Sequence, residues 1–211
     1  MGTWDPLGKV LRLKKANPTR PFDSKEGRLP PGQYLTEKFP VLHYGSVPKF
    51  DPNTWDFKIW GLVENPIRLN WEEFTKLPTI QVVTDIHCVT RWSKFDTKWQ
   101  GVPWDWVMET AKPKPEARYI MLHSEHGFTA NVPLEDALMD EKTMLAYKYN
   151  DLPLEPEHGH PLRFLLPHLY FWKSAKWLRG IEFMANDRAG FWEGYGYHMH
   201  GDPWLVQRFA E

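Results

Sequence analysis

Short segments with apolar residues at alternate positions, or with runs of β-branched residues, recur along this chain and predict many short strands. The segment WDFKIWGLV (55–63) alternates apolar and polar residues, and TIQVVTDIHCV (79–89) is an apolar, β-branched run. Both patterns are typical of strands. Further strands are predicted in FPVLHYGSVP (39–48), on both sides of Gly127, and in TMLAYKY (143–149), HPLRFLLPH (160–168) and AKWLRGIEFM (175–184).

The predicted helices are few and short. In NWEEFTKLP (70–78), Asn70 is a good N-cap and Pro78 ends the helix. A second helix is predicted in VPWDWVMETA (102–111) and a third from Pro133, whereas SKFDTKWQGVPW (93–104) is interpreted as a turn and a short strand. There is no regular β-α-β alternation, so the sequence predicts an α+β fold with mixed β-sheets and short helices.

The length of 211 residues is most simply that of one domain. Residues 1–31 are basic and rich in proline, and we expect an extended N-terminal arm that lies over a single domain at 32–211.

The charge balance and the single cysteine limit the possible partners and the compartment. The 26 Lys and Arg residues are balanced by 27 Asp and Glu residues, which argues against a nucleic-acid-binding protein. No apolar run approaches the ~18 residues of a transmembrane segment. No export signal is recognisable, and one cysteine cannot form an internal disulfide, so we expect a cytoplasmic protein.

Cys88 stands where a buried strand is predicted to end. A lone cysteine is usually inert and buried, but functional groups collect where strands pass into loops. A thiolate there would act as a nucleophile or as a soft metal ligand. A cysteine–histidine hydrolase would need a base, and His87 is a poor one because adjacent strand residues point to opposite faces.

Histidines and cations provide weaker signals. The histidines form three short pairs, HSEH, HGH and HMH, but no CxxC or HExxH accompanies them, so a zinc site made by the protein alone is not expected. The segment from His158 to Gly180 combines several cations with Ser174, which is typical of an anion site or of a solvated basic face. Neither standard phosphate loop occurs.

Taken together, four blocks resemble the molybdopterin-binding domain of the sulfite oxidase family. They are FPVLHYGSVP, VVTDIHCVTRWSKFDTKWQGV, the region from VPLEDALMD through HGHPLRFLLP to KSAKWLRGI, and GFWEGYGYHMHGDPW. They occur in the family's order and cover about residues 32–209. The resemblance implies the sulfite oxidase-type fold and a molybdenum–molybdopterin cofactor, whose chemistry the protein holds and tunes.

The resemblance also assigns roles to particular residues. Cys88 would supply the protein thiolate to molybdenum, and Tyr197 would donate a proton or a hydrogen bond in the substrate pocket. The pterin and its phosphate would be bound by His43, Tyr44, His158, Arg163, Ser174, Ala175 and Lys176.

The run after the cysteine, CVTRWS, departs from the C-x-G-N-R-R run of animal and plant sulfite oxidases, whose arginines help to bind sulfite. It is closer to the C-V-x-x-W-S run of bacterial catalytic subunits that reduce sulfoxides, so we expect a prokaryotic protein. The function implied is oxygen-atom transfer, or S- or N-oxide reduction, on a small molecule, with a separate electron-transfer partner. A non-catalytic pterin-binding or interaction module on the same scaffold is the alternative. Substrate, reaction direction, oligomeric state and any nucleotide on the pterin stay open.

Overall fold

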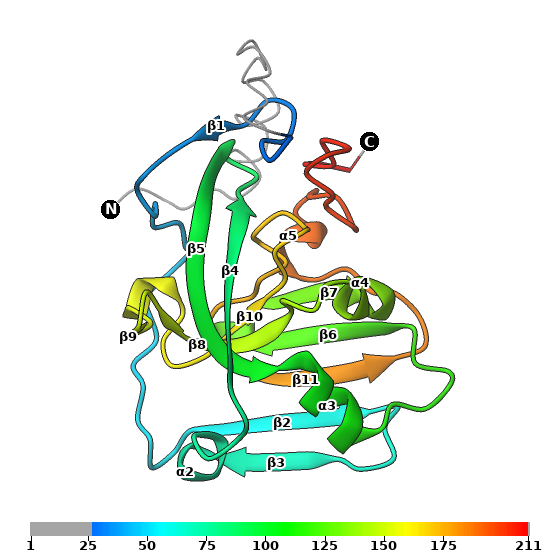
Figure 1. Ribbon diagram of the computed structural model, residues 1–211. Coiled ribbons are helices and arrows are strands. Elements are labelled where there is room, and N and C mark those ends of the chain that lie inside the picture. Colours follow the sequence, from blue (N-terminus) through cyan, green and yellow to red (C-terminus); the bar gives the residue numbers. More distant parts are fainter. Residues whose placement is uncertain (1–26, 211) are drawn as a thin grey trace.

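The computed structural model describes residues 27–210, and most of the arm predicted at 1–31 therefore lies outside the described residues. The described strands form two sheets (Figure 1). The first sheet contains β1 (Tyr34–Leu35), β4 (Ile80–His87), β5 (Trp92–Pro103), β8 (Met144–Tyr149), β9 (Leu152–Pro153) and β10 (Arg163–Leu165). The second contains β3 (Ile67–Asn70), β2 (Asp56–Gly61), β11 (Leu178–Met184), β6 (Tyr119–Ser124) and β7 (Thr129–Pro133), in that spatial order.

Both sheets are mixed. Strand β1 runs parallel to β5 and β11 runs parallel to β2, whereas the other pairs are antiparallel. The helices between the strands are short: α2 (Trp71–Phe74), α3 (Trp104–Ala111), α4 (Leu134–Met139) and α5 (Phe191–Gly194), with 3₁₀ turns at Glu125–Gly127 and Pro156–His158. The prediction of an α+β fold with mixed sheets and short helices is confirmed. Within residues 27–210, no helix combines the length and the apolar character needed to cross a membrane.

Local sequence explains where several elements begin. The Asn70 side chain accepts a hydrogen bond from the Glu73 backbone N–H at 2.9 Å, and the Glu73 carboxylate accepts one from the Asn70 N–H at 2.8 Å. This capping box starts α2 at the predicted residue. The helix ends at Phe74, earlier than Pro78, and i→i+3 bonds from the Lys76 and Leu77 N–H groups to the Glu73 and Phe74 carbonyls continue the turn up to Leu77.

Two predictions of local structure are wrong. Residues 39–48 form no strand, because prolines at both ends and Gly45, with φ of 69°, interrupt a β-ladder. The segment from Trp92 is one strand of 12 residues instead of a turn and a short strand. Its turn-like residues produce an irregularity in the β4–β5 ladder near Asp96, which has φ of 53°, so the hairpin bends without ending.

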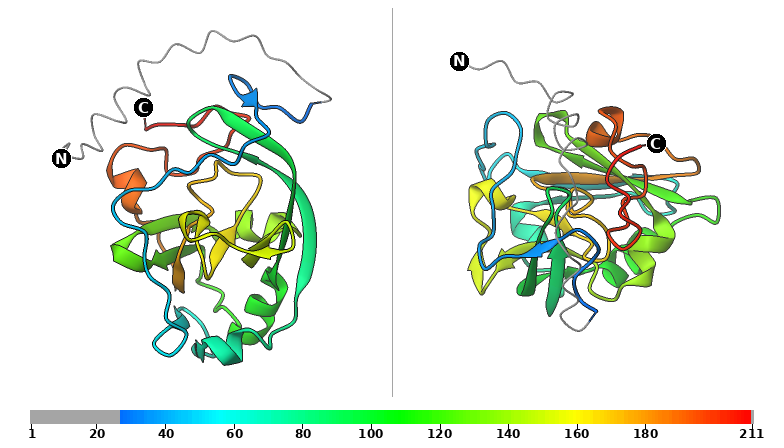
Figure 2. Two further views of the ribbon diagram at one scale, coloured as in Figure 1. Left: turned by 90° about the vertical axis from the view of Figure 1, so that its left-hand side faces the viewer. Right: turned by 90° about the horizontal axis from the view of Figure 1, so that it is seen from above.

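The β4–β5 hairpin extends beyond the rest of its sheet, and both ends of the described chain lie against it (Figures 1 and 2). Strand β1 pairs with the start of β5. The C-terminal segment after α5 packs near the turn between β4 and β5, where the Tyr197 and Phe209 rings join a cluster that contains Cys88 and Trp92. The fold thus places residues from both ends of the chain around Cys88.

Candidate functional site

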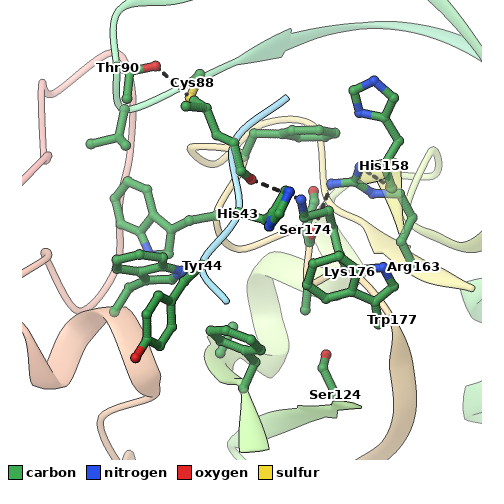
Figure 3. Close-up of a pocket in the computed structure, with 18 of the residues that line it drawn as sticks. His43, Tyr44, Cys88, Thr90, Ser124, His158, Arg163, Ser174, Lys176 and Trp177 are labelled. Carbon is green, nitrogen blue, oxygen red and sulfur yellow. Dashed lines mark hydrogen bonds between the residues drawn. The ribbon is translucent and has the colours of Figure 1, made fainter. Parts of the chain in front are cut away.

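One cavity collects every site residue predicted from the sequence. Its empty volume is about 980 Å³, which includes space that is open to solvent. This is a size typical of ligand pockets. The predicted residues in its wall are His43, Tyr44, Cys88, His158, Arg163, Ser174, Ala175, Lys176 and Tyr197, most of which are labelled in Figure 3. The structure brings them together, and their roles toward a cofactor stay predictions.

Cys88 follows β4 and begins a tight turn. Its N–H donates to the Trp92 carbonyl at 2.8 Å, and its carbonyl accepts from the Arg91 N–H at 2.9 Å. Arg91 takes a left-handed φ of 77°, which closes the turn. The thiol is 7% exposed and lies 3.1 Å from the Thr90 hydroxyl. The turn therefore presents the sulfur to the cavity with a hydroxyl beside it.

His87 faces away from this cavity. Its Nδ1 lies 2.8 Å from the Ser93 hydroxyl, and its ring lines a separate polar cavity beside Asp85 and His168. Burial lowers its pKa to about 4. The alternation of strand side chains thus separates His87 from Cys88, and the two do not form a nucleophile–base pair.

Arg163 is a buried cation at another part of the wall. Only 2% of the residue is exposed. Its terminal nitrogens donate to the His158 carbonyl at 2.9 Å and to the Ser174 carbonyl at 2.8 Å, while Nε has no partner in the described part of the chain. Burial lowers its pKa to about 9. A buried guanidinium that is bonded to carbonyls and to no described carboxylate is suited to bind an anion.

Lys176 and His158 complete this basic side of the cavity. The Lys176 ammonium donates to the Leu42 carbonyl at 2.9 Å and to the Glu157 carbonyl at 2.8 Å, so it ties the 39–44 segment across the cavity. Burial, together with the charges of Arg163 and Lys176, lowers the pKa of His158 to about 4. Its ring is therefore a neutral hydrogen-bonding group, stacked on Phe39 with the ring centroids 3.8 Å apart.

Tyr44 packs its ring against Phe128 and Phe191, whereas Nδ1 of His43 is buried and has no partner among the described residues. The Ser174 hydroxyl is bonded to the backbone of Leu166. Ser174 and Ala175 would therefore contribute mainly backbone to the cavity wall.

Tyr197 stands on the same side as Cys88. It is 3% exposed and its ring lies 5.1 Å from Trp172, 5.2 Å from Trp192 and 5.6 Å from Phe209, measured between centroids. Burial raises its pKa, and the nearby Cys88 sulfur and Glu193 reinforce that shift. The phenol therefore keeps its proton at neutral pH and is available as a donor.

Sequence reasoning missed some cavity residues. Ser124 lines the wall at the end of β6, and its buried hydroxyl finds no partner within residues 27–210. Its position at the end of a strand could have indicated a cavity residue, but in the segment HSEH only the two histidines were considered as candidates. Thr90 was also missed, although it stands two residues after Cys88.

The residues present fit a phosphorylated pterin. Four buried polar atoms of residues in the wall have no partner among residues 27–210: His43 Nδ1, Trp92 Nε1, Ser124 Oγ and Arg163 Nε. Unpaired buried polar atoms are costly unless a ligand satisfies them. The protein would add one soft sulfur, from Cys88, and cations for a phosphate. Among the described residues, no group of three or more His, Cys, Asp or Glu side chains is arranged to hold a metal ion.

The fold and this site define a molybdopterin-binding oxidoreductase, and comparison with known proteins agrees. The family model described as "Oxidoreductase molybdopterin binding domain" matches residues 44–192. The chain is 52% identical to YuiH of Bacillus subtilis (strain 168), described as an oxidoreductase, over 91% of this chain and 96% of that protein. The chain belongs to the oxidoreductase molybdopterin-binding family. The predicted family and its molybdenum–molybdopterin cofactor are thereby confirmed.

Two further similarities are more distant. The chain is 30% identical to the catalytic subunit of the protein-methionine-sulfoxide reductase MsrP of Campylobacter jejuni, over 72% of this chain and 56% of that protein. The structure of the sulfane dehydrogenase SoxCD from Paracoccus pantotrophus matches with a TM-score of 0.61 at 19% identity, covering 88% of this chain and 60% of that one. The second match confirms the predicted fold.

Proposed function

We propose that this protein uses its molybdenum–molybdopterin cofactor to reduce a small, uncharged S- or N-oxide at a metal held by Cys88. When bound, the cofactor supplies a two-electron centre that exchanges an oxygen atom with the substrate. The similarity to the sulfoxide reductase catalytic subunit supports this choice of substrate class.

The distribution of charge in the cavity is the observation that carries the proposal. The labelled cationic residues Arg163 and Lys176 lie on one side in Figure 3 with His158, whereas Cys88 and Thr90 lie on the other. Apart from Thr90, the cavity residues that pack around Cys88 are apolar or aromatic: Val89, Trp92, Phe171, Trp172, Trp192 and Tyr197. Sulfite and nitrate are anions that cationic groups would have to bind. An uncharged oxide fits the aromatic walls better.

Each residue of the site would have a different role. Cys88 would hold the metal, and its turn fixes the direction of the sulfur. Arg163 and Lys176 would bind the phosphate of the pterin, with Ser124 and His43 as hydrogen-bonding partners of the ring system. Tyr197 holds a proton on Oη at neutral pH and would donate a hydrogen bond to the oxide oxygen of the substrate.

A separate electron-transfer partner belongs to the proposal, because reduction of an oxide consumes two electrons for each turnover. Placement in the cytoplasm is also proposed, supported by the single cysteine in the chain.

The test is a turnover assay on protein purified from a host that makes the cofactor. We expect the wild type to reduce methionine sulfoxide or trimethylamine N-oxide with reduced viologen as electron donor, and to oxidise sulfite far more slowly. Cys88→Ser should abolish oxide reduction while pterin fluorescence of the extract shows that the site is still filled. Pterin bound without turnover on any oxide would favour the non-catalytic module, and faster turnover of sulfite would refute the substrate class.

A further inference from the structure

Gln33 and Arg208 meet beside the Cys88 turn, although they are separated by 175 positions in the sequence. Both side chains are buried, at 3% and 7% exposure. Both also lie outside residues 44–192, the segment that matches the family model. We call these two residues the clamp.

The clamp holds the backbone of the turn from one side. The Gln33 amide nitrogen donates to the Cys88 carbonyl at 3.0 Å and to the Trp92 carbonyl at 3.1 Å. Arg208 donates to the Val89 carbonyl at 2.7 Å and to the Gln33 amide oxygen at 2.9 Å. Because both ends of the Gln33 amide are engaged, its orientation is fixed, and three carbonyls of the turn are held by two side chains.

Arg208 also connects this turn to Tyr197. Its backbone carbonyl accepts from the His198 N–H at 3.3 Å, and the adjacent Phe209 forms a β-bridge with Tyr197. The Ala210 N–H donates to the Gly196 carbonyl at 3.0 Å. The terminal segment therefore fixes the backbone around Tyr197 and, through one guanidinium, the backbone around Cys88.

The charge of Arg208 is unusual for a structural arginine. Its hydrogen bonds within the described chain go to carbonyl and amide oxygens and none to a carboxylate. Its guanidinium lies 4.9 Å from the centroid of the Tyr170 ring. Burial of a cation is costly, and a clamp with only a structural role could hold the same carbonyls with a neutral donor.

We propose that Gln33 and Arg208 are positioning residues that set Cys88 and Tyr197 relative to each other for the reaction. The inference rests on the proposed function, since it takes Cys88 as the metal ligand and Tyr197 as the donor. The clamp acts on the backbone, so the sulfur and the phenol move when it is removed, while the phosphate-binding side around Arg163 stays intact.

The experiment compares Arg208→Met, Arg208→Lys and Gln33→Leu in the cofactor-loaded full-length protein. Arg28→Met is the matched control, because Arg28 also bridges strands β4 and β5 through Asp85 and Asp96 but makes no bond to the turn. The readouts are pterin content, the electron paramagnetic resonance spectrum of the one-electron-reduced metal, and kcat and KM for oxide reduction.

For Arg208→Met and Gln33→Leu we expect unchanged pterin content, shifted resonance positions, and kcat reduced about tenfold to a hundredfold with KM within about twofold. Arg208→Lys should recover part of kcat because its ammonium reaches the Val89 carbonyl. Arg28→Met should leave spectrum and kcat unchanged. If Arg208→Met does not fold, Gln33→Leu decides the test.

Two negative results are distinguishable. A wild-type spectrum and kcat in both clamp variants, combined with a changed spectrum in Cys88→Ser, would overturn the clamp inference alone. A wild-type spectrum in Cys88→Ser would overturn the proposed function, because the metal would not then be held by Cys88.

Discussion

A buried ion pair lies behind the aromatic wall of the cavity, and its contacts predict how far the free energy of unfolding falls when the pair is broken. The Lys173 ammonium and the Glu193 carboxylate are 2.6 Å apart, and both side chains are 0% exposed. Lys173 also donates to the Asn131 carbonyl and to the Met199 carbonyl, at 2.8 and 2.6 Å. Glu193 in turn accepts from the Trp172 indole at 2.8 Å. The pair therefore joins α5 to the segments that carry Trp172 and Met199.

Replacement of Lys173 by Met keeps the length of the side chain and removes its charge. The Glu193 carboxylate then stays buried with the Trp172 indole as its donor. The carbonyls of Asn131 and Met199 lose the hydrogen bond from Lys173, although the Met199 carbonyl still accepts from the Asn131 amide nitrogen at 3.2 Å. Removal of one member of a buried pair costs about 3–5 kcal/mol, so we expect the free energy of unfolding to fall by this amount. The double variant Lys173→Met/Glu193→Gln should recover about 1–3 kcal/mol, because no charge is left unpaired.

Urea unfolding followed by tryptophan fluorescence, at matched cofactor content, measures both changes. Lys76→Met is the control, since its partner Glu72 is exposed, and it should leave the unfolding midpoint unchanged. Equal stability of Lys173→Met and the wild type, or a double variant less stable than the single one, would contradict the expected cost of the unpaired carboxylate.

Two further predictions concern pH and cofactor retention. Burial alone would lower the pKa of His168, but the Asp136 hydrogen bond at 3.0 Å and the Asp140 carboxylate raise it to about 9. The charged form of His168 therefore stabilises the fold by at most about 3 kcal/mol. This stabilisation is complete below about pH 6.5 and is lost as the pH rises through about 9. His168→Gln should therefore flatten the fall in unfolding free energy over that range, and an unchanged slope would contradict the assignment. Separately, Arg163→Met should reduce bound pterin on the order of tenfold or more by loss of the phosphate contact, measured by fluorescence of the acid-oxidised extract. Arg179→Met, which removes an arginine paired with Asp56 and Glu125, should retain pterin, and equal loss in both variants would show a general folding defect.

Local patterns were enough to predict features that depend on neighbouring residues. The capping box of α2 and the strand that delivers Cys88 to a turn both follow from residues within a few positions. The prediction of a turn within β5 is wrong because the same residues that make a turn also make a bulge between paired strands. Only the partner strand decides between the two.

The candidate site was predicted from motif resemblance, and its geometry depends on contacts that no local pattern contains. Ser124 and Arg163 come from different sheets, and Gln33 reaches Arg208 across most of the chain. Nothing near Arg208 in the sequence indicates a bond to the Val89 carbonyl, because that contact exists only once the terminal segment packs against the hairpin.

We propose that Cys88 holds the cofactor's metal. X-ray absorption at the molybdenum edge tests it most directly, on wild type and Cys88→Ser at equal molybdenum and pterin content. We expect the variant to lose one sulfur neighbour of the metal and to keep the sulfurs of the pterin. An identical sulfur count in the two proteins would contradict it.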